Sequence, residues 1–307
     1  FMYRKHPAYE DAAHTAVIAE NKPRTLAGMR GLGRALSRRF RDRSADVAIG
    51  FTYYANAIAL SAAMKAGVRA RIATQHNPAW AYPRLGRWMD HRAGRRGVYT
   101  ANIAVSRAVA DTFRHHAARY RSLLQVIPNG ICPLEPQRDR DETRAAIGVP
   151  LRAPLILAAG RLVEQKNHAT LVRAMADAPG VHLAIAGEGH LRSSLEGIAS
   201  RAGVADRLHL LGQVPPSDVR DLMAAADVFA MPSLHEGMSL TLLEALAAGL
   251  PVIASSIPAQ AEVLQPGGTD PVGILHDPSD RSGLASALQQ LTSNEPLRRE
   301  YARRSLA

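Results

Sequence analysis

The chain of 307 residues contains little cysteine, little lysine and few aromatic residues. Cys132 is the only cysteine, so no disulfide can form within the chain, which is typical of a reducing cytoplasm. Aromatic residues make up 5% of the sequence, which disfavours a nucleic-acid-binding protein, because such proteins place aromatic rings between clustered arginines. We therefore expect no nucleic acid among the partners.

Long apolar runs and clusters of metal ligands are missing as well. No stretch approaches the roughly 20 apolar residues of a transmembrane helix, and no signal peptide is recognisable. Histidine, cysteine and aspartate do not group at the spacings typical of metal sites, so we expect no metal. The expected location is the cytoplasm, and peripheral contact with the inner face of the membrane is left open.

Arginine supplies nearly all of the positive charge. The net charge is +11, while lysine is confined to Lys5, Lys22, Lys65 and Lys166. The codon usage of a GC-rich genome accounts for this bias without any function. The alternative is attraction to an anionic partner, either membrane lipid or nucleic acid.

Residues 24–43 show the same ambiguity on a smaller scale. The segment predicts a basic amphipathic helix in which Leu32, Leu36 and Phe40 form an apolar stripe. Its cations are Arg30, Arg34, Arg38, Arg39, Arg41 and Arg43. We favour an ordinary helix whose apolar stripe packs on the core. A helix that lies on anionic lipid is the alternative.

Strands and helices alternate in two separate runs along the chain. The first run has predicted strands at 46–50, 70–74, 102–105 and 124–127, and the second has them at 155–159, 182–186, 208–211, 227–233, 251–254 and 272–275. Such alternation predicts parallel sheets covered on both faces. Residues 131–150 lose the periodicity and are expected to form a linker. The sequence thus predicts an α/β protein with a domain at 1–130 and another at 151–307.

The most informative segment runs from His235 to Ala254. It carries Glu236 and Glu244, separated by seven residues, at the start of a predicted helix between two predicted strands. Ligands bind at the carboxyl edge of an open α/β sheet, where a helix N-terminus offers backbone N–H groups to an anion such as a phosphate. The two carboxylates are suited to hydrogen bonds with the hydroxyls of a sugar and a ribose on either side of the phosphates.

This segment, with Ala-x-Ala-x-Gly-x-Pro-Val at 245–252, resembles the donor site of retaining glycosyltransferases of the GT-B fold, glycosyltransferase family 4 type (group 1 glycosyl transferases). The resemblance covers roughly residues 45–293. It implies two Rossmann-like, doubly wound domains that face a cleft. It also implies transfer of a sugar, with retention, from a UDP-, GDP- or ADP-sugar to a glycan, a lipid or a small molecule, as in polysaccharide or lipopolysaccharide biosynthesis. The nucleotide-sugar is then a substrate, and no cofactor is expected.

The loop that follows the strand at 155–159 carries two cations, Arg161 and Lys166. Two cations aimed at a departing nucleoside diphosphate would stabilise the negative charge that grows on it. The resemblance implies diphosphate contacts for both residues. It further implies that Glu244 binds the ribose and that Glu236 orients the donor sugar.

The resemblance implies further donor contacts around these residues. The backbone at Gly237, Met238, Ser239 and Leu240 would bind the diphosphate, Gly187 would lie near the nucleotide, and Gln213 and Val214 would flank the base. From the first domain, His76 would lie near the donor sugar and the acceptor. Ser106 is expected to cap a helix, and Gly130 in the Asn129-Gly130 pair is expected to make a tight turn.

Two other classes of function remain as alternatives. One is a sugar-nucleotide epimerase of the same fold, and the other is a basic protein that binds nucleic acid or a membrane surface. Gly187-Glu188-Gly189 resembles the start of a dinucleotide fingerprint, but Arg192 stands where its third glycine is required. A nicotinamide cofactor is therefore not expected.

The resembled enzymes begin with a strand and a glycine-rich loop that are not recognisable here, so the first domain is expected to be incomplete. An incomplete domain would leave a sheet edge and apolar surface uncovered. The chain is therefore expected to be aggregation-prone and inactive as a transferase, while its second domain should still bind nucleotide.

Overall fold

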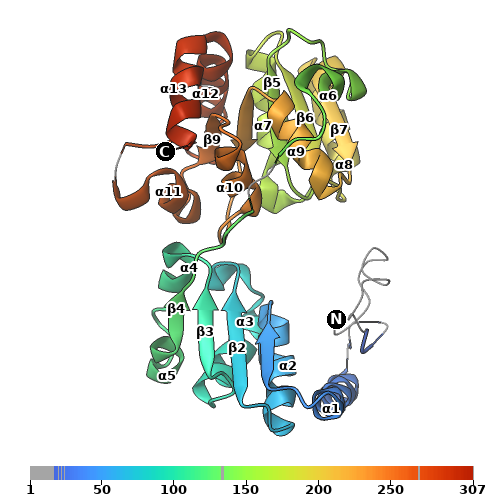
Figure 1. Cartoon of the computed structure of the whole chain (residues 1–307). Coiled ribbons are helices and arrows are strands. Elements are labelled where there is room, and N and C mark those ends of the chain that lie inside the picture. Colours follow the sequence, from blue (N-terminus) through green and yellow to red (C-terminus); the bar gives the residue numbers. More distant parts are fainter. Residues whose placement is uncertain are drawn as a thin grey trace. The chain divides into compact units, whose positions relative to one another are not determined.

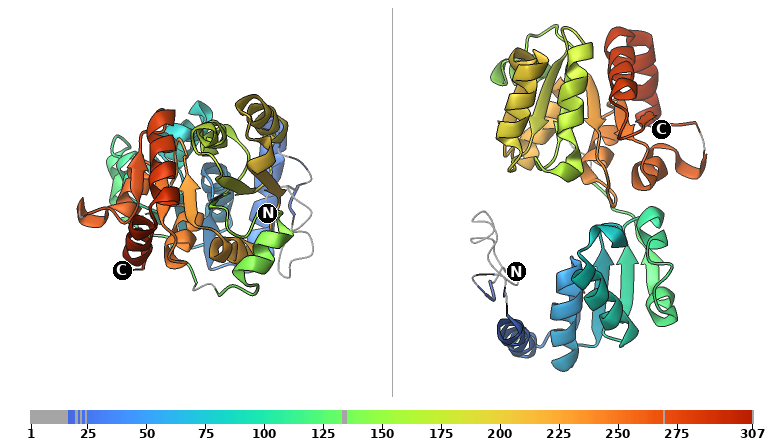
Figure 2. Two further views of the ribbon diagram at one scale, coloured as in Figure 1. Left: turned by 90° about the horizontal axis from the view of Figure 1, so that it is seen from above. Right: turned by 180° about the vertical axis from the view of Figure 1, so that it is seen from behind.

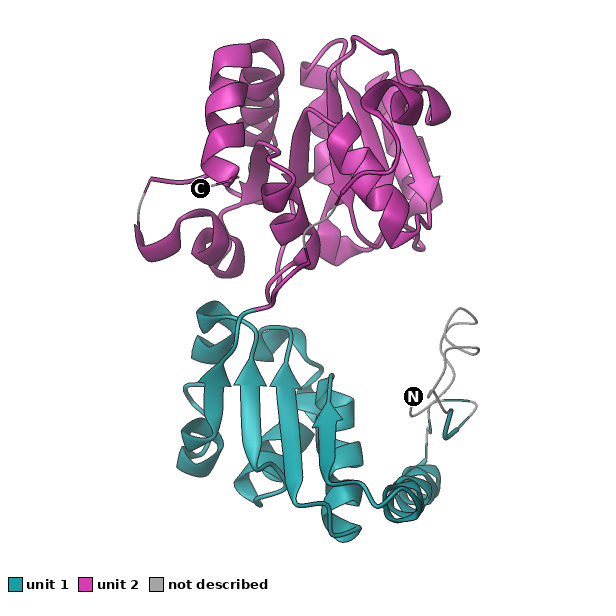
Figure 3. Ribbon diagram, viewed as in Figure 1, with its two compact units in different colours: residues 1–128 teal, residues 129–307 magenta. Residues whose placement is uncertain are grey.

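The computed structural model describes residues 17–19, 21, 23, 25–132, 135–268 and 270–306. The chain divides into two compact units, Phe1–Pro128 (unit 1) and Asn129–Ala307 (unit 2), which are coloured separately in Figure 3. Each unit is built on a parallel sheet, so the predicted α/β class with two Rossmann-like domains is confirmed. No helix within the described ranges combines the length and the apolar character needed to cross a membrane.

Unit 1 contains a four-stranded parallel sheet whose strands follow one another in chain order (Figure 1). The strands are β1 (Val47–Gly50), β2 (Ala70–Gln75), β3 (Ala101–Ala104) and β4 (Leu124–Val126). The helices are α1 (Leu26–Asp42), α2 (Tyr53–Lys65), η2 (Ala79–Ala81), α3 (Arg84–Arg95), α4 (Arg107–Asp111) and α5 (Ala118–Ser122). Because parallel crossovers are right-handed and all run in one direction here, α2 and α3 cover the same face, as Figure 2 shows.

The opposite face of this sheet is open at β1. Ala48 and Gly50 are buried on the side of α2, whereas Val47 and Ile49 are each 51% exposed. The expectation of cover on both faces therefore does not hold at β1 within the described residues. The cause is the monotonic strand order, which places no crossover helix of the described segment on that side.

The structure of helix α1 decides between the two interpretations given for residues 24–43. Thr25 caps the helix by accepting a hydrogen bond from the backbone N–H of Gly28 at 3.1 Å. Leu32 and Leu36 are buried and pack with Ile58 of α2, so the apolar stripe meets the core, as favoured. Arg24, where the predicted helix begins, lies outside the described residues.

Unit 2 contains a six-stranded parallel sheet in the order β10-β9-β8-β5-β6-β7. The strands are β5 (Leu155–Ala159), β6 (His182–Ala186), β7 (Leu208–Gly212), β8 (Val228–Met231), β9 (Val252–Ser255) and β10 (Ile274–His276). The chain moves outward in one direction from β5 to β7 and in the other from β8 to β10. This reversal between β5 and β8 is the mark of a doubly wound sheet.

Helices cover both faces of the unit 2 sheet. They are α6 (Arg140–Ala146), η3 (Glu164–Lys166), α7 (His168–Ala174), η4 (Met175–Asp177), α8 (Arg192–Ala202), η5 (Ala205–Arg207), α9 (Pro216–Ala225), α10 (Leu240–Ala247), α11 (Pro258–Leu264), η6 (Pro266–Gly268), α12 (Arg281–Ser293) and α13 (Glu295–Ser305). Successive residues of β5 enter different cores: Leu155 and Leu157 join one cluster, and Ile156 and Ala158 join the other. A strand buried on both faces reads as a continuous apolar run, which is why it was recognisable in the sequence.

Residues 140–146, placed in the linker by the sequence interpretation, form helix α6. Asp139 accepts a hydrogen bond from the backbone N–H of Glu142, and the Glu142 side chain accepts one from the backbone of Asp139, which is a capping box. Helix α6 packs on α9 and belongs to unit 2. Its charged sequence hid it, because only Thr143 and Arg144 of this helix are buried.

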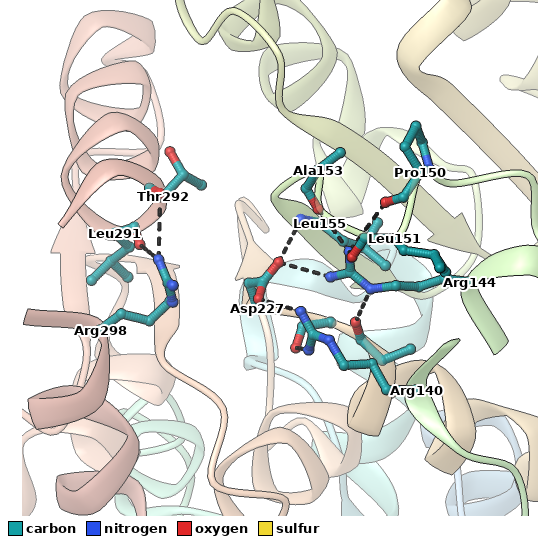
Figure 4. A network of polar contacts seen from close by, with 12 residues as sticks. Arg140, Arg144, Pro150, Leu151, Ala153, Leu155, Asp227, Leu291, Thr292 and Arg298 are labelled. Atoms are coloured by element: carbon teal, nitrogen blue, oxygen red, sulfur yellow. Dashed lines mark hydrogen bonds and ion pairs between the residues drawn. The ribbon is translucent and has the colours of Figure 1, made fainter. Parts of the chain in front are cut away.

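Arg144 anchors this helix to the amino ends of β5 and β8 (Figure 4). Its side chain is fully buried and forms an ion pair of 2.9 Å with Asp227, which also accepts the backbone N–H of Leu155 at 2.8 Å. The remaining guanidinium hydrogens go to backbone carbonyls, among them Leu151 at 2.9 Å and Ala153 at 2.7 Å. Arg140 pairs with the second oxygen of Asp227 at 2.7 Å.

Candidate functional site

Two loops of unit 2 meet at the carboxyl ends of β5 and β8, where the strand order reverses. The first, residues 160–167, follows β5, and the second, residues 232–239, follows β8. In a doubly wound sheet, ligands bind in the crevice outside the carboxyl ends of the strands at this reversal point. Both loops were singled out in the sequence, and the fold places them side by side.

Lys166 and Glu236 join the two loops directly. The Lys166 Nζ atom donates a hydrogen bond to Glu236 Oε1 at 2.7 Å, and the side chains are 15% and 9% exposed. An ammonium group has three hydrogens, so two remain for an anion after one is given to Glu236. The structure therefore brings together the predicted diphosphate cation and the predicted sugar-orienting carboxylate.

Gln165 reinforces this junction and was not predicted as a site residue. The side-chain amide of Gln165 donates to the backbone oxygen of His235 at 2.9 Å, and the backbone carbonyl of Gln165 accepts the N–H of Leu234 at 2.8 Å. These bonds fix the backbone on both sides of the Lys166–Glu236 pair. Its position next to Lys166 was the only signal in the sequence.

Two glycines allow the turns at this sheet edge to approach one another. Gly160 and Gly187 have φ angles of +147° and +156°, and a Cβ atom on Gly187 would lie 2.0 Å from the carbonyl oxygen of Gly160. The N–H of Leu162 donates to the carbonyl of Glu188 at 2.8 Å across the same contact. Gly187 thus shapes the turn after β5, and its predicted contact with a nucleotide stays a prediction.

The N-terminus of α10 is open for an anion. Ser239 is its N-cap, but the Ser239 side chain makes no capping hydrogen bond and instead pairs with the Thr241 hydroxyl at 3.0 Å. Leu240, the first helical residue, is 48% exposed. Backbone N–H groups and the helix dipole therefore favour negative charge here, in line with the predicted role of the 237–240 backbone.

Asn129 holds the loop in front of α10. Its side-chain amide donates to the carbonyl of Met238 at 2.9 Å, and its backbone N–H contacts the Met238 sulfur at 3.2 Å. Gly130 does not have the positive φ that a tight turn was expected to need. The asparagine, rather than the glycine, is therefore the structural residue of this pair.

Glu244 lies at the fifth position of α10 and is half-buried. Burial raises the pKa of Glu244, while the nearby charge of Arg220 opposes the rise. Arg220 belongs to α9 and was not predicted. A carboxylate that is partly desolvated on the first turns of an open helix can accept the hydroxyls of a ribose, and this role stays a prediction.

The other predicted donor residues of unit 2 lie along the same sheet edge. Arg161 is exposed, and no ion-pair partner is found for it among the described residues. Gln213 is exposed after β7, and Val214 packs partly into the core. Strand β6 lies between β5 and β7, so Gln213 and Val214 are two strands away from the loop that carries Lys166. Their contacts with a base stay predictions.

His168 is the first residue of α7, directly after the loop that carries Arg161 and Lys166, and it is buried. Burial, and then the charge of Lys166, lower the pKa of His168 to about 4, so the ring is neutral at neutral pH. A neutral ring beside Lys166 adds no competing charge. The sequence gave no reason to single it out, since it resembles any residue at a helix start.

In unit 1, His76 follows the carboxyl end of β2. Its Nε2 atom lies 2.8 Å from the hydroxyl of Thr74, and that hydroxyl gives its one hydrogen to the carbonyl of Gly50 at 2.6 Å. His76 must therefore be the donor to Thr74, which leaves Nδ1 as an acceptor. Burial lowers the pKa of His76, so the neutral ring persists at neutral pH.

A buried polar network fixes the strand end that carries His76. Gln75 donates to Tyr120 at 2.9 Å and to Asn102 at 3.1 Å, and Tyr120 and Tyr99 donate to the buried carboxylate of Asp90 at 2.6 and 2.8 Å. Burial raises the pKa of Asp90. Farther along the chain, Ser106 caps α4 by accepting the N–H of Val109 at 3.1 Å, as expected.

Metal ligands were not expected, and no group of three or more His, Cys, Asp or Glu side chains suited to a metal is found in the part of the chain that the structure describes. The sequence contains one Asp-x-Asp triplet, a common metal-binding pattern, at Asp139-Arg140-Asp141. Asp139 is the N-cap of α6 and Asp141 lies in its first turn, so helix capping accounts for both residues.

Two family models match this chain. The model described as glycosyl transferases group 1 matches residues 139–306, and the model described as glycosyltransferase family 4 matches residues 3–133. The first match alone covers more than half of the 307 residues and nearly all of unit 2.

Curated proteins with similar sequences match part of the chain. The lipopolysaccharide core biosynthesis glycosyltransferase LpsE of Rhizobium meliloti is 35% identical over 161 residues, which cover 52% of this chain and 46% of that protein. A GDP-mannose-dependent monoacylated alpha-(1-6)-phosphatidylinositol monomannoside mannosyltransferase of Corynebacterium glutamicum is 32% identical over 189 residues, covering 56% and 48%. The chain thus spans about half the length of the curated relatives it matches.

Solved structures share the fold over nearly the whole chain. HepE of Anabaena, solved in complex with UDP and glucose, has a TM-score of 0.82 at 21% identity, covering 95% of this chain and 80% of that one. The sucrose-phosphate synthase of Thermosynechococcus elongatus has a TM-score of 0.75 at 21% identity, covering 93% and 74%. At this level of identity the likeness concerns the fold.

Proposed function

The chain belongs to the group 1 glycosyl transferases, and on this premise we propose that unit 2 binds a nucleotide-sugar whose sugar is transferred to an acceptor, with retention of configuration. The single observation that carries the proposal is the Lys166–Glu236 pair of 2.7 Å at the reversal point of the sheet, next to the uncapped N-terminus of α10. Family membership favours transfer over the epimerase alternative and over a basic protein that only binds nucleic acid.

The proposed chemistry is electrostatic. As the bond from the sugar to the diphosphate breaks, negative charge grows on the departing phosphate oxygens. The two free hydrogens of Lys166, the Arg161 guanidinium and the N–H groups at the start of α10 are proposed to stabilise that charge. Donors that are already fixed in position by Gln165 and Glu236 need little reorganisation during the reaction.

Glu236 and Glu244 are proposed to read the two ends of the donor. Glu236 lies beside the loop that carries Arg161 and Lys166. Its second oxygen can orient a sugar hydroxyl while the first accepts the hydrogen bond from Lys166. Glu244 lies farther along α10 and would accept the ribose hydroxyls. His76 of unit 1, with Nδ1 left as an acceptor, is proposed to contact a hydroxyl of the sugar or the acceptor.

The donor and acceptor classes are proposed from the relatives. HepE was solved with UDP-glucose, which supports a UDP-sugar, while the mannosyltransferase of Corynebacterium glutamicum is named for GDP-mannose. The names of the relatives include a lipopolysaccharide core enzyme and a phosphatidylinositol mannoside enzyme, which supports a glycan or a lipid-linked acceptor. Because a lipid-linked acceptor lies in a membrane, the proposal includes a peripheral contact of the protein with an anionic membrane.

Titration calorimetry on the whole chain tests the donor site without requiring turnover. UDP, GDP and ADP are compared with their sugar conjugates. Glu244→Gln should weaken binding of the preferred free nucleoside diphosphate by about tenfold, the cost of one hydrogen bond to a charged group. Glu236→Ala should weaken the nucleotide-sugar more than the free diphosphate, because it loses the sugar contact.

Glu196→Gln is the matched control, because Glu196 is an exposed glutamate on α8 that pairs only with Arg192 in the described structure. It should bind every nucleotide like the unchanged chain. If a folded sample binds none of the nucleoside diphosphates, the assignment of the donor site to unit 2 is wrong. Equal effects of Glu236→Ala on diphosphate and nucleotide-sugar would remove the proposed sugar contact.

A further inference from the structure

Helix α3 of unit 1 has an inverted amphipathic pattern. Its buried residues are Gly86, Asp90, Ala93 and Gly94, which are small or polar. Of its three large apolar residues, Met89 packs partly on the cluster of α1 and α2, whereas Leu85 and Trp88 are 65% and 57% exposed. A helix normally turns its large apolar side chains to the core, so this inversion marks a surface that meets something other than water.

The inversion follows from how α3 packs on α2. A Cβ atom on Gly86 would lie 2.5 Å from the ring of Tyr53, and one on Gly94 would lie 2.2 Å from the ring of Tyr120. At Gly86 and Gly94 the inner face of α3 is thus filled by the rings of Tyr53 and Tyr120 and has no room for leucine or tryptophan. The outer face carries the large residues although packing does not require them there.

The exposed apolar residues form one patch with arginines around it. Trp80, in the turn η2 that precedes α3, is 57% exposed, so both tryptophans of this protein are accessible to solvent. We call α3 outer patch the set of Trp80, Arg84, Leu85, Trp88, Arg92 and Arg95. The guanidinium of Arg92 lies 5.2 Å from the centre of the Trp88 ring.

The helices of this layer are strongly cationic. Helix α1 has five arginines, α2 ends in Lys65 and α3 has four arginines, against Asp42 and the buried Asp90. Arg30, Arg34, Arg38 and Arg41 of α1 and Lys65 line a groove of about 980 Å³ between α1 and α2. Like charges four residues apart on a helix are destabilising, so an anionic partner would relieve a cost that is present in the free protein.

We propose that the α3 outer patch docks on a bilayer surface that contains anionic phospholipids. Tryptophan and leucine would enter the headgroup region, where an amphipathic indole is favoured, and the arginines would pair with lipid phosphates. A second copy of this chain is disfavoured as the occupant, because two cationic surfaces would repel each other. A nucleic acid is disfavoured because Arg92 already covers a face of the Trp88 ring on which a base would stack.

Docking through this patch has a consequence for the acceptor. Helix α3 begins eight residues after His76, which directly follows β2 at the carboxyl edge of the unit 1 sheet. A bilayer held at the start of α3 would therefore present a lipid-linked molecule near His76.

The two tryptophans make the test direct, since they are the only ones in the chain. The whole chain is mixed with phosphatidylcholine vesicles, with and without phosphatidylglycerol, and no nucleotide is added, so the result is independent of the donor proposal. Tryptophan emission should shift to shorter wavelength only with phosphatidylglycerol. Sedimentation with the vesicles should weaken as salt rises from about 0.01 M to about 1 M, where the screening length falls to about 3 Å.

Two pairs of variants separate the patch from the rest of the surface. Leu85→Ser should weaken vesicle binding about tenfold or more, because one leucine no longer enters the bilayer, while both tryptophans remain as reporters. Leu151→Ser is the control, an exposed leucine of unit 2 (51%), and should bind as the unchanged chain does. Arg84→Gln with Arg95→Gln should weaken binding roughly thirtyfold, and Arg152→Gln with Arg201→Gln, also exposed, should change it little.

Three outcomes would overturn the proposal. The first is an emission spectrum that phosphatidylglycerol vesicles leave unchanged. The second is an equal loss of binding in Leu85→Ser and Leu151→Ser. The third is a shift produced by single-stranded DNA that competes with the vesicles, which would assign the patch to nucleic acid instead.

Discussion

The two ends of strands β5 and β8 carry ion pairs that look alike and differ in what surrounds them. At the amino ends, Arg144 and Asp227 pair at 2.9 Å, and at the carboxyl ends, Lys166 and Glu236 pair at 2.7 Å. Arg144 also donates to four backbone carbonyls, and Asp227 accepts a backbone N–H. The Lys166 ammonium group has Glu236 as its one hydrogen-bond partner among the described residues, and it lies between a glycine turn and an open helix start.

The comparison teaches how one sheet separates stability from function. A buried charge is tolerated only when its hydrogen bonds are satisfied, and the amino-end pair meets that condition. The carboxyl-end pair keeps hydrogens unused, which costs free energy unless an anion or water takes them. The same strands therefore hold a structural pair at one edge and a pair prepared for a ligand at the other.

Removal of Arg144 should have the largest effect on stability. Arg144→Ala leaves Asp227 and several carbonyls without their partner, which should lower the free energy of unfolding by about 3–5 kcal/mol. The melting temperature, followed by circular dichroism, should fall by on the order of 10 °C. Arg140→Ala is the control, because it pairs with the same carboxylate but is 43% exposed, and it should cost about 1 kcal/mol or less. Similar losses for the two variants would contradict the structural role given to Arg144.

A methyl group at Gly187 should disturb the carboxyl edge. Gly187→Ala places its Cβ against the carbonyl of Gly160 at a φ angle that disfavours side chains, which should cost about 2–4 kcal/mol and displace the loop after β5. Both the urea midpoint and the affinity for nucleoside diphosphate should fall. Gly180→Ala has a similar strain, at φ +73°, but no atom lies within 4 Å of its Cβ. It should lose stability by about 1 kcal/mol and keep its affinity, and a matching loss of affinity would refute the close-approach argument.

Lys166→Ala should affect turnover more than stability, whereas Arg144→Ala should mainly affect stability. Loss of a donor that acts on the departing diphosphate should lower turnover by about a hundredfold or more. Stability should fall less than in Arg144→Ala, because one hydrogen bond to Glu236 is lost rather than the five hydrogen bonds of Arg144. Turnover is measured as release of nucleoside diphosphate from the preferred donor. A variant with unchanged turnover would remove Lys166 from the site.

The smallest effect concerns pH and His168. Its pKa is about 4 when folded and 6.5 when unfolded, so protonation below pH 6.5 favours the unfolded chain. The stability that the neutral ring contributes is complete above pH 6.5 and is lost as the pH falls toward 4. The free energy of unfolding should fall between pH 7 and pH 5 in both proteins. In His168→Gln this fall should be smaller than in the unchanged chain by on the order of 1–2 kcal/mol, measured by urea unfolding at each pH. A pH dependence that the substitution leaves unchanged would show that this ring does not titrate as described.

The patterns that could be read in advance are those set by local sequence. The strands of unit 2 were recognisable because both faces are buried, and the segment from Glu236 to Glu244 because a helix follows a strand there. The group 1 family and the two Rossmann-like domains are confirmed on this basis. Helix α6 was missed, because its only buried side chains are Thr143 and a charged arginine.

The sequence by itself determined most of the succession of strands and helices along the chain, the family and the identity of the cations and carboxylates, since these depend on residues close together in the chain. Only the tertiary structure decided that Lys166 pairs with Glu236 seventy residues away, that Gly187 shapes the turn of Gly160, and that α3 turns Leu85 and Trp88 outward. Such contacts depend on which strands become neighbours and how much space lies between helices. Strand order and packing volume are properties of the whole fold, and no short segment encodes them.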